Sequence, residues 1–134
     1  MPMINGEVRP AHDDGTGLEA RIMVHVVGAS RVFRTLEVVV DTGYTGWMSL
    51  PEPIINDIGL DYMGIRPATL ANGQTVPTAA YNAGLLWHGR PVDVVVQALN
   101  NKPMVGAELL AYCRLTVDWW DGGEVVIEER MPAA

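Results

Sequence analysis

Apolar residues alternate with other residues along Leu18 to Val27, and this period of two predicts a β-strand with one buried face. A turn at residues 28–30 separates this strand from a second apolar run, Val32 to Val40. The second run ends in three consecutive valines, which leave neither face polar and predict a buried strand. A shorter strand is expected at Ile4 to Val8, before a polar loop at residues 9–17. The first third of the chain is therefore predicted to be β-structure.

The next part of the chain combines a helix signal with a hairpin signal. The segment Pro51 to Ile58 begins with proline and is followed by Gly59, which favours a short helix. The pair Asn72-Gly73 predicts a two-residue hairpin turn, because both positions of that turn favour positive φ. The arms of this hairpin are expected near Pro67 to Ala71 and Gln74 to Tyr81.

Two further hairpins are expected after this one. The pair His88-Gly89 predicts a turn between strands at residues 82–87 and 90–97. Near the end of the chain, Leu115 to Trp120 and Glu124 to Glu129 flank a glycine-rich turn. The chain is therefore expected to close with a hairpin.

A short helix is expected between these two hairpins. Gly106 lets another part of the backbone come close, and the spacing of Leu109, Leu110 and Cys113 favours about two helical turns facing the core.

The pair Trp119-Trp120 is expected to cap the core.

The composition is typical of a folded globular protein. The chain has 134 residues, of which 49% are hydrophobic and 19% charged, so we expect residues 1–134 to form a single domain. The net charge of −7 repels phosphate backbones and anionic lipid, which argues against nucleic acid or a membrane as partner. No apolar run approaches the roughly 18 residues of a spanning helix, and residues 1–7 lack the features of a signal peptide. A cytoplasmic protein is expected.

Candidate metal ligands are few. The single cysteine, Cys113, cannot form an internal disulfide and lies in an apolar segment, which favours burial over reactivity. The histidines His12, His25 and His88 are far apart in the sequence and have no metal-ligand spacing with Cys113. We therefore expect no metal site.

One acidic residue follows the buried valine strand directly. Asp41 is succeeded by Thr42 and Gly43, and Gly46 precedes a brief strand expected at residues 47–50. The glycines allow a sharp turn just after the acid. A carboxylate at the mouth of a buried strand is costly unless it is hydrogen-bonded, paired or used in chemistry. Asp41 is therefore a candidate catalytic residue, and the alternative is an ordinary turn aspartate.

Three features of the chain occur together: the Val-Val-Val-Asp41-Thr42-Gly43 run, the Asn72-Gly73 hairpin, and Met104-Val105-Gly106 before the expected second helix. In this combination the chain resembles the retropepsin-like aspartic proteases of the bacterial single-lobe type. The aromatic Tyr44 after the motif is similar to the bacterial branch of that family. The resemblance implies a mainly β, single-lobe acid-protease barrel with one or two short helices.

The resemblance also implies an aspartic endopeptidase that needs no metal or organic cofactor. Asp41 would supply half of a catalytic dyad, and the other half would come from a second subunit, because the chain contains one Asp-Thr-Gly and no Asp-Ser-Gly. A two-fold homodimer brings a residue on its axis to its own copy. Two adjoining carboxylates then hold one proton between them, so that one acts as base on a water and the other polarises the peptide carbonyl. The expected substrate is an extended peptide.

Residues around the aspartate receive roles from the same resemblance. Thr42 would make hydrogen bonds across the dimer axis, and Gly43 would keep the backbone close to substrate. Tyr44 is expected at the substrate cleft, which its ring would either shape or block, and Gly106 would pack behind the active-site loop. The Asn72-Gly73 hairpin matches the flap that closes over a bound peptide.

The resemblance further suggests that the terminal strands, Ile4 to Val8 and Val125 to Glu129, interleave across the dimer. The alternative function is a non-catalytic dimeric β-module that binds peptides or partner proteins through the same cleft, because a fold can persist after its chemistry is lost. The intact Asp-Thr-Gly favours the enzyme. The appearance or absence of cleavage products distinguishes the two functions.

Overall fold

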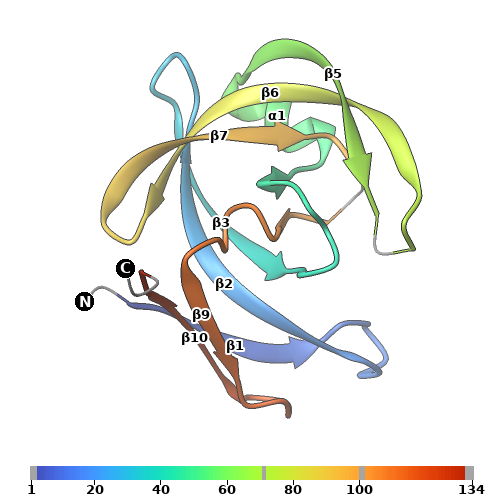
Figure 1. Ribbon diagram of the computed structural model, residues 1–134, viewed down its shortest axis with the longest axis vertical. Helices are drawn as coiled ribbons and strands as arrows, with labels where there is room; N and C mark the ends of the chain where they lie inside the picture. Colours follow the sequence, from blue (N-terminus) through green and yellow to red (C-terminus); the bar gives the residue numbers. More distant parts are fainter. Residues whose placement is uncertain (1–2, 71, 100–101, 132–134) are drawn as a thin grey trace.

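The computed structural model describes residues 3–70, 72–99 and 102–131, which form ten strands and one short helix (Figure 1). The strands are β1 (Met3–Pro10), β2 (Leu18–Val27), β3 (Phe33–Val40), β4 (Met48–Ser49), β5 (Asp61–Thr69), β6 (Thr75–Trp87), β7 (Arg90–Gln97), β8 (Met104–Val105), β9 (Cys113–Val117) and β10 (Glu124–Glu129). They belong to one sheet in the order β5-β6-β7-β4-β8-β3-β2-β1-β10-β9, and a further pairing of β6 with β2 closes part of it on itself. The predicted mainly β architecture is confirmed.

The antiparallel strands β2 and β3 form the hairpin that leads to the candidate aspartate. Alternate residues of β2 are buried, including Ile22, Val24 and Val26, as the period of two predicted. In β3 the first residues alternate between exposed and less exposed positions, whereas the three valines at residues 38–40 are buried or half-buried. The reason is that the end of β3 lies between two neighbours, β2 and β8.

The terminal strands pair with each other inside one chain. β1 is antiparallel to both β2 and β10, and β10 is antiparallel to both β1 and β9. Both edges of β1 and of β10 are therefore already hydrogen-bonded within the single chain. The expected interleaving of these strands would require the pairings to exchange between two chains, and it stays a prediction. The edges of the sheet are β5 and β9.

The predicted first helix is confirmed as α1 (Glu52–Ile58). Pro51 is its N-cap, and Gly59 ends it in the left-handed conformation with φ of 76°. Ile55 and Ile58 are buried, so the helix covers one part of the core. No helix of the described residues is long and apolar enough to cross a membrane.

The hairpin of β5 and β6 is present, but its turn differs from the expected one. Gly73 has φ of 84°, and the Leu70 N–H donates to the Gln74 carbonyl at 2.9 Å. The connection is therefore longer than two residues; Ala71 lies outside the described residues. The two-residue turn with positive φ at both positions occurs at His88-Gly89, with values of 50° and 77°.

The strands expected at residues 74–81 and 82–87 are one continuous strand, β6, of 13 residues. This length lets β6 pair with β5 at one end, with β2 near the other end, and with β7 between Ala80 and Trp87. The same strand therefore joins the projecting hairpin to the body of the sheet.

Two expectations for the last third of the chain are wrong. Residues 107–112 form a series of turns instead of a helix, because Tyr112 takes φ of 62° and Cys113 already begins β9. Trp119 and Trp120 do not cap the core: their exposed fractions are 56% and 62%, since the β9–β10 turn carries them away from it.

Buried apolar residues form two separate clusters. The main core joins most of the strands and α1. A smaller cluster consists of Tyr44, Ala68 and Met104, with Val39, Val76 and Leu99 packed against it. No described residue of the hairpin between 66 and 78 belongs to the main core, so the smaller cluster is what packs the hairpin onto the sheet.

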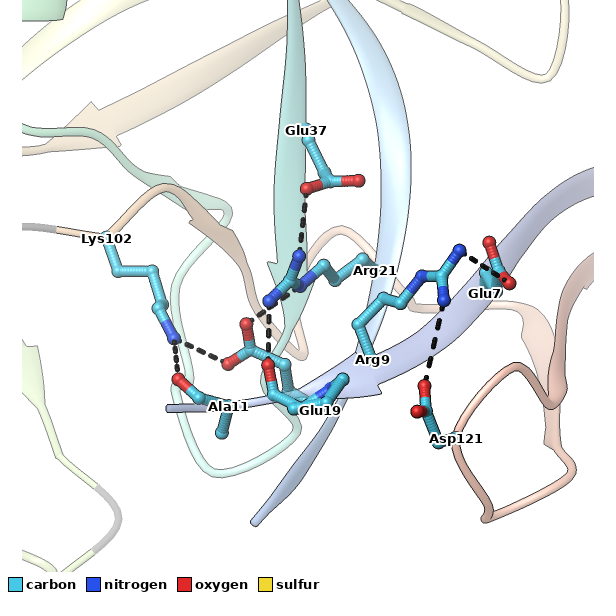
Figure 2. Close-up of polar contacts among 9 residues, drawn as sticks. Glu7, Arg9, Ala11, Glu19, Arg21, Glu37, Lys102 and Asp121 are labelled. Atoms are coloured by element: carbon cyan, nitrogen blue, oxygen red, sulfur yellow. Dashed lines mark hydrogen bonds and ion pairs between the residues drawn. The ribbon is translucent and has the colours of Figure 1, made fainter. Parts of the chain in front are cut away.

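A charged cluster surrounds Glu19, which is 8% exposed (Figure 2). Its two carboxylate oxygens accept hydrogen bonds from Arg21 Nε at 2.9 Å and from Lys102 Nζ at 2.6 Å. Arg21 also donates to Glu37 and to the Pro10 carbonyl. A buried carboxylate is stable only with such partners. Lys102 directly precedes Pro103 and β8, so the cluster anchors the start of the strand that pairs with β3.

We expect Glu19→Gln to lower the free energy of unfolding by about 2 kcal/mol, because the amide keeps the size of the side chain but turns an N–H2 group toward a cation. Urea denaturation measures the change. The matched control is Glu7→Gln, which removes an exposed pair with Arg9 and is expected to change stability by less than about 0.5 kcal/mol. Equal losses in the two variants would contradict the role of the cluster.

Candidate active site

Asp41 lies at the end of β3, where the backbone is held by a parallel strand. Val39 and Val40 pair with Met104 and Val105 of β8. The Asp41 N–H donates to the Val105 carbonyl at 2.9 Å, which extends the parallel ladder to the aspartate itself. Asp41 is half-buried, so its carboxylate lies at the boundary between the sheet and solvent.

The loop after Asp41 orients the carboxylate. Gly43 N–H donates to Asp41 Oδ1 at 2.9 Å, and Tyr44 N–H donates to the Asp41 carbonyl at 3.2 Å. Within the described residues no hydrogen bond to Oδ2 is present, so this oxygen is the one that can meet a water or a second carboxylate. The Gly43 contact is also the ordinary geometry of a turn aspartate, and it therefore suits both interpretations of Asp41.

The predicted neighbours of Asp41 differ in exposure. Thr42 is exposed beside the aspartate, and Gly43 is half-buried. An exposed threonine next to a half-buried carboxylate is available to a second chain. The predicted role of Thr42 at a dimer axis stays a prediction.

Gly106 lies directly behind this loop. A Cβ atom on Gly106 would stand 2.4 Å from the Gly46 carbonyl oxygen and 2.6 Å from the Tyr44 ring, so only glycine fits. Three N–H groups of this segment donate to the loop: Gly106 to Trp47, Ala107 to Tyr44 and Glu108 to Gly46, at 3.0, 2.8 and 3.2 Å. The loop is therefore held from behind by the backbone of residues 106–108.

The expectation that Tyr44 lines a substrate cleft is wrong. Tyr44 is only 2% exposed, and its ring packs inward between the loop and Gly106. Its hydroxyl donates toward Gln97 Oε1 at 2.5 Å, and the Met48 carbonyl is 3.2 Å away. Burial raises the pKa of the Tyr44 hydroxyl, which keeps it protonated and able to donate. The aromatic ring is thus part of the support of the loop.

Asn72 and Gly73 lie at the exposed tip of the β5–β6 hairpin. The Gln74 N–H donates to Asn72 Oδ1 at 2.8 Å, which closes the tip locally. In Figure 1 this hairpin descends on the right of the view, the side toward which β3 and the loop after it point. The smaller apolar cluster places Ala68 of the hairpin beside Tyr44 of the loop. The hairpin and the Asp41 loop are therefore neighbours in space.

The sequence interpretation missed Gln97, the last residue of β7. It is 5% exposed, accepts from Tyr44, and donates through Nε2 to the Pro67 carbonyl at 3.2 Å. A signal was present, because Gln97 follows three valines in the way that Asp41 does. A polar side chain at the end of a buried strand needs a partner, and that rule identifies both residues.

His88 and Cys113, which are distant in the sequence, come together in the structure. Cys113 Sγ lies 3.5 Å from His88 Nε2. Burial, followed by the charge of Glu129, raises the pKa of the Cys113 thiol, so the thiolate is disfavoured. In the part of the chain that the structure describes, no group of three or more His, Cys, Asp or Glu side chains could hold a metal ion.

Comparison with known proteins identifies the fold. No protein-family model matches the chain, and no curated protein matches it. The chain is similar to a solved structure of a retropepsin-like aspartic protease from Rickettsia conorii, with a TM-score of 0.50 and 14% sequence identity. The similarity covers 98% of this chain and 97% of that chain. The chain therefore has a retropepsin-like fold over nearly its whole length.

We expect Gly106→Ala to lower the free energy of unfolding by about 2 kcal/mol or more, because the new methyl group collides with backbone that three hydrogen bonds hold in place. Urea denaturation of the purified variant measures the loss. Gly84→Ala is the matched control, since its Cβ would find its nearest atom, the Val27 carbonyl oxygen, at an ordinary 3.6 Å. If the two variants were equally stable, the close approach at Gly106 would not constrain the loop.

Proposed function

We propose that this chain is an aspartic endopeptidase whose catalytic dyad consists of Asp41 from each of two subunits. The observation that carries the proposal is the position of Asp41: it opens an Asp-Thr-Gly loop at the end of β3, beside β8 and in front of Gly106, in a retropepsin-like fold. An ordinary turn aspartate needs no second strand paired beside it. It also needs no glycine whose missing side chain lets another segment support its loop.

The dimer follows from the count of motifs. One chain holds one Asp-Thr-Gly, whereas a dyad needs two carboxylates. Two-fold symmetry supplies the second carboxylate, because a residue on the axis meets its own copy. Thr42, exposed beside Asp41, would then face the same residue of the partner. Formation of the active site and association of the subunits are one event in this proposal.

The chemistry uses a proton shared by the two carboxylates. The ionised Asp41 takes a proton from a bound water as the water oxygen attacks the peptide carbonyl carbon. The protonated Asp41 donates a hydrogen bond to the carbonyl oxygen, where negative charge develops. The tetrahedral intermediate then collapses, the C–N bond breaks, and the leaving nitrogen takes up a proton from the dyad. The dyad holds one proton again at the end of the cycle.

The substrate proposed is a peptide in an extended conformation. The β5–β6 hairpin, with Asn72 and Gly73 at its tip, would cover such a peptide and exclude water from the cleavage site. An extended backbone can pair with exposed backbone groups of the hairpin and of the Asp41 loop. An unfolded protein or a flexible loop offers this conformation, whereas a folded helix does not.

We expect Asp41→Asn to lower the rate of peptide cleavage by at least about a thousandfold, because the amide cannot act as the base. Cleavage of an unfolded casein or a quenched peptide library, followed by mass spectrometry of the products, measures this loss. The control Asp13→Asn changes an exposed aspartate of the loop between β1 and β2 and is expected to leave cleavage unchanged. Full activity of Asp41→Asn would exclude the aspartic mechanism. Peptide binding by the wild-type chain without any product would support the binding module instead.

Mixing experiments test the shared site directly. When wild-type chain exchanges subunits with a ninefold excess of Asp41→Asn chain, only about a tenth of the wild-type chains find a wild-type partner, so activity per wild-type chain should fall to about a tenth. The same excess of Asp13→Asn chain should not lower the activity per wild-type chain. Unchanged activity in the first mixture, with exchange verified by a mass tag, would mean that one chain carries a complete site.

A further inference from the structure

Tyr44 connects the Asp41 loop to its surroundings through both its backbone and its side chain. Its N–H donates to the Asp41 carbonyl at 3.2 Å, and its own carbonyl accepts from Ala107 N–H at 2.8 Å. The residue is therefore fixed between the aspartate and the segment that supports the loop from behind. A displacement of the Tyr44 ring would be transmitted to the peptide unit that follows Asp41.

The side chain of Tyr44 reaches Gln97. The Tyr44 hydroxyl has one proton to donate, and the Gln97 Oε1 atom, at 2.5 Å, is closer than the Met48 carbonyl oxygen at 3.2 Å. Gln97 is the nearer acceptor, and both side chains are buried. Polar groups buried in this way stay in place because a separated pair would leave a donor and an acceptor without partners.

Gln97 carries the connection onward to the hairpin. Its Nε2 donates to the Pro67 carbonyl of β5 at 3.2 Å. The Pro67 carbonyl can only accept, so the N–H2 group of Gln97 faces Pro67. The oxygen of the same amide faces the Tyr44 hydroxyl. Pro67 faces Pro77 across the hairpin. Hydrogen-bonded and non-hydrogen-bonded pairs alternate along an antiparallel hairpin, and Leu70 with Gln74 is a hydrogen-bonded pair. Pro67 with Pro77, three pairs further on, is therefore a non-hydrogen-bonded pair, and the Pro67 carbonyl is free to accept from Gln97.

A second, apolar contact joins the same two elements. The Tyr44 ring lies in the smaller cluster with Ala68 of β5 and Met104 of β8, and Val76 of β6 packs against it. Because the hairpin between residues 66 and 78 contributes nothing to the main core within the described residues, its attachment depends on this cluster and on Gln97. Tyr44 takes part in both attachments.

We propose that Tyr44 and Gln97 are positioning residues that couple the β5–β6 hairpin to the Asp41 loop, so that the hairpin is held over the site in register with the carboxylate. This inference rests on the proposed function, because it assigns the hairpin the task of covering a peptide. The link itself is a property of the fold and can be measured without any substrate. Neither residue touches the reacting atoms, and their effect acts through Pro67 and through the loop backbone.

The variant Tyr44→Phe removes the hydroxyl and keeps the ring, whereas Gln97→Met keeps the volume of the glutamine and removes both of its hydrogen bonds. Hydrogen exchange of the backbone amides in residues 66–76 should rise about five- to tenfold in each variant, with little change in β1, β2 and β10. If the two residues act as one link, the double variant should exchange no faster than the single ones. The control Tyr81→Phe removes a hydroxyl from a half-buried tyrosine of β6 outside the link and should leave exchange unchanged.

Cleavage provides the second readout. The value of kcat/KM for an extended peptide should fall about tenfold in Tyr44→Phe, in Gln97→Met and in the double variant alike, and should stay at the wild-type value in Tyr81→Phe. Absence of cleavage in the wild-type chain overturns the proposed function while the exchange data still test the link. Unchanged hairpin exchange in both single variants, a uniform rise across the whole chain, or additive losses in the double variant would overturn the link. If Tyr44→Phe does not fold, Gln97→Met carries the same test.

Discussion

The arrangement of the candidate site depends on one close contact of backbone with backbone, between the Asp41 loop and the segment that begins at Gly106. A side chain on Gly106 would meet the Gly46 carbonyl at 2.4 Å, so the contact exists only because that side chain is absent. Three hydrogen bonds from residues 106–108 then hold the loop, and the parallel pairing of β3 with β8 holds the aspartate that precedes it. The backbone on both sides of the carboxylate is therefore supported, and such support is what acid–base chemistry at a fixed distance would require.

Buried polar groups extend this support in two directions. Toward the hairpin, Tyr44 and Gln97 form a connection that ends at Pro67. Across β3, Glu19 of β2 holds Lys102 just before β8 begins. Both connections are stable because each buried polar atom has a partner, and both would be costly to leave half complete. Two polar networks thus hold the elements next to the aspartate, β2, β7 and the segment before β8, although its own hydrogen bonds are few.

Several elements could be predicted from local pattern alone. The period of two in β2, the valines at the end of β3, and proline and glycine at the ends of α1 all led to elements that the structure contains. Errors arose where local preference competed with tertiary contacts. Residues 107–112 have helical spacing, yet their backbone donates to the Asp41 loop and turns at Tyr112 instead. Trp119 and Trp120 are apolar enough for a core, yet the β9–β10 turn exposes them.

The sequence by itself determined the identity of the candidate aspartate and the glycine behind it, because a carboxylate after a valine strand and a glycine after an apolar pair are both visible without coordinates. It also shows a single Asp-Thr-Gly, which is why the proposed dyad would take its second carboxylate from another chain. Only the tertiary structure decided which way Tyr44 points, that Gln97 is its partner, and that the terminal strands pair within one chain. These features depend on residues far apart in the sequence, and their geometry follows from how the sheet curls, which no local pattern contains.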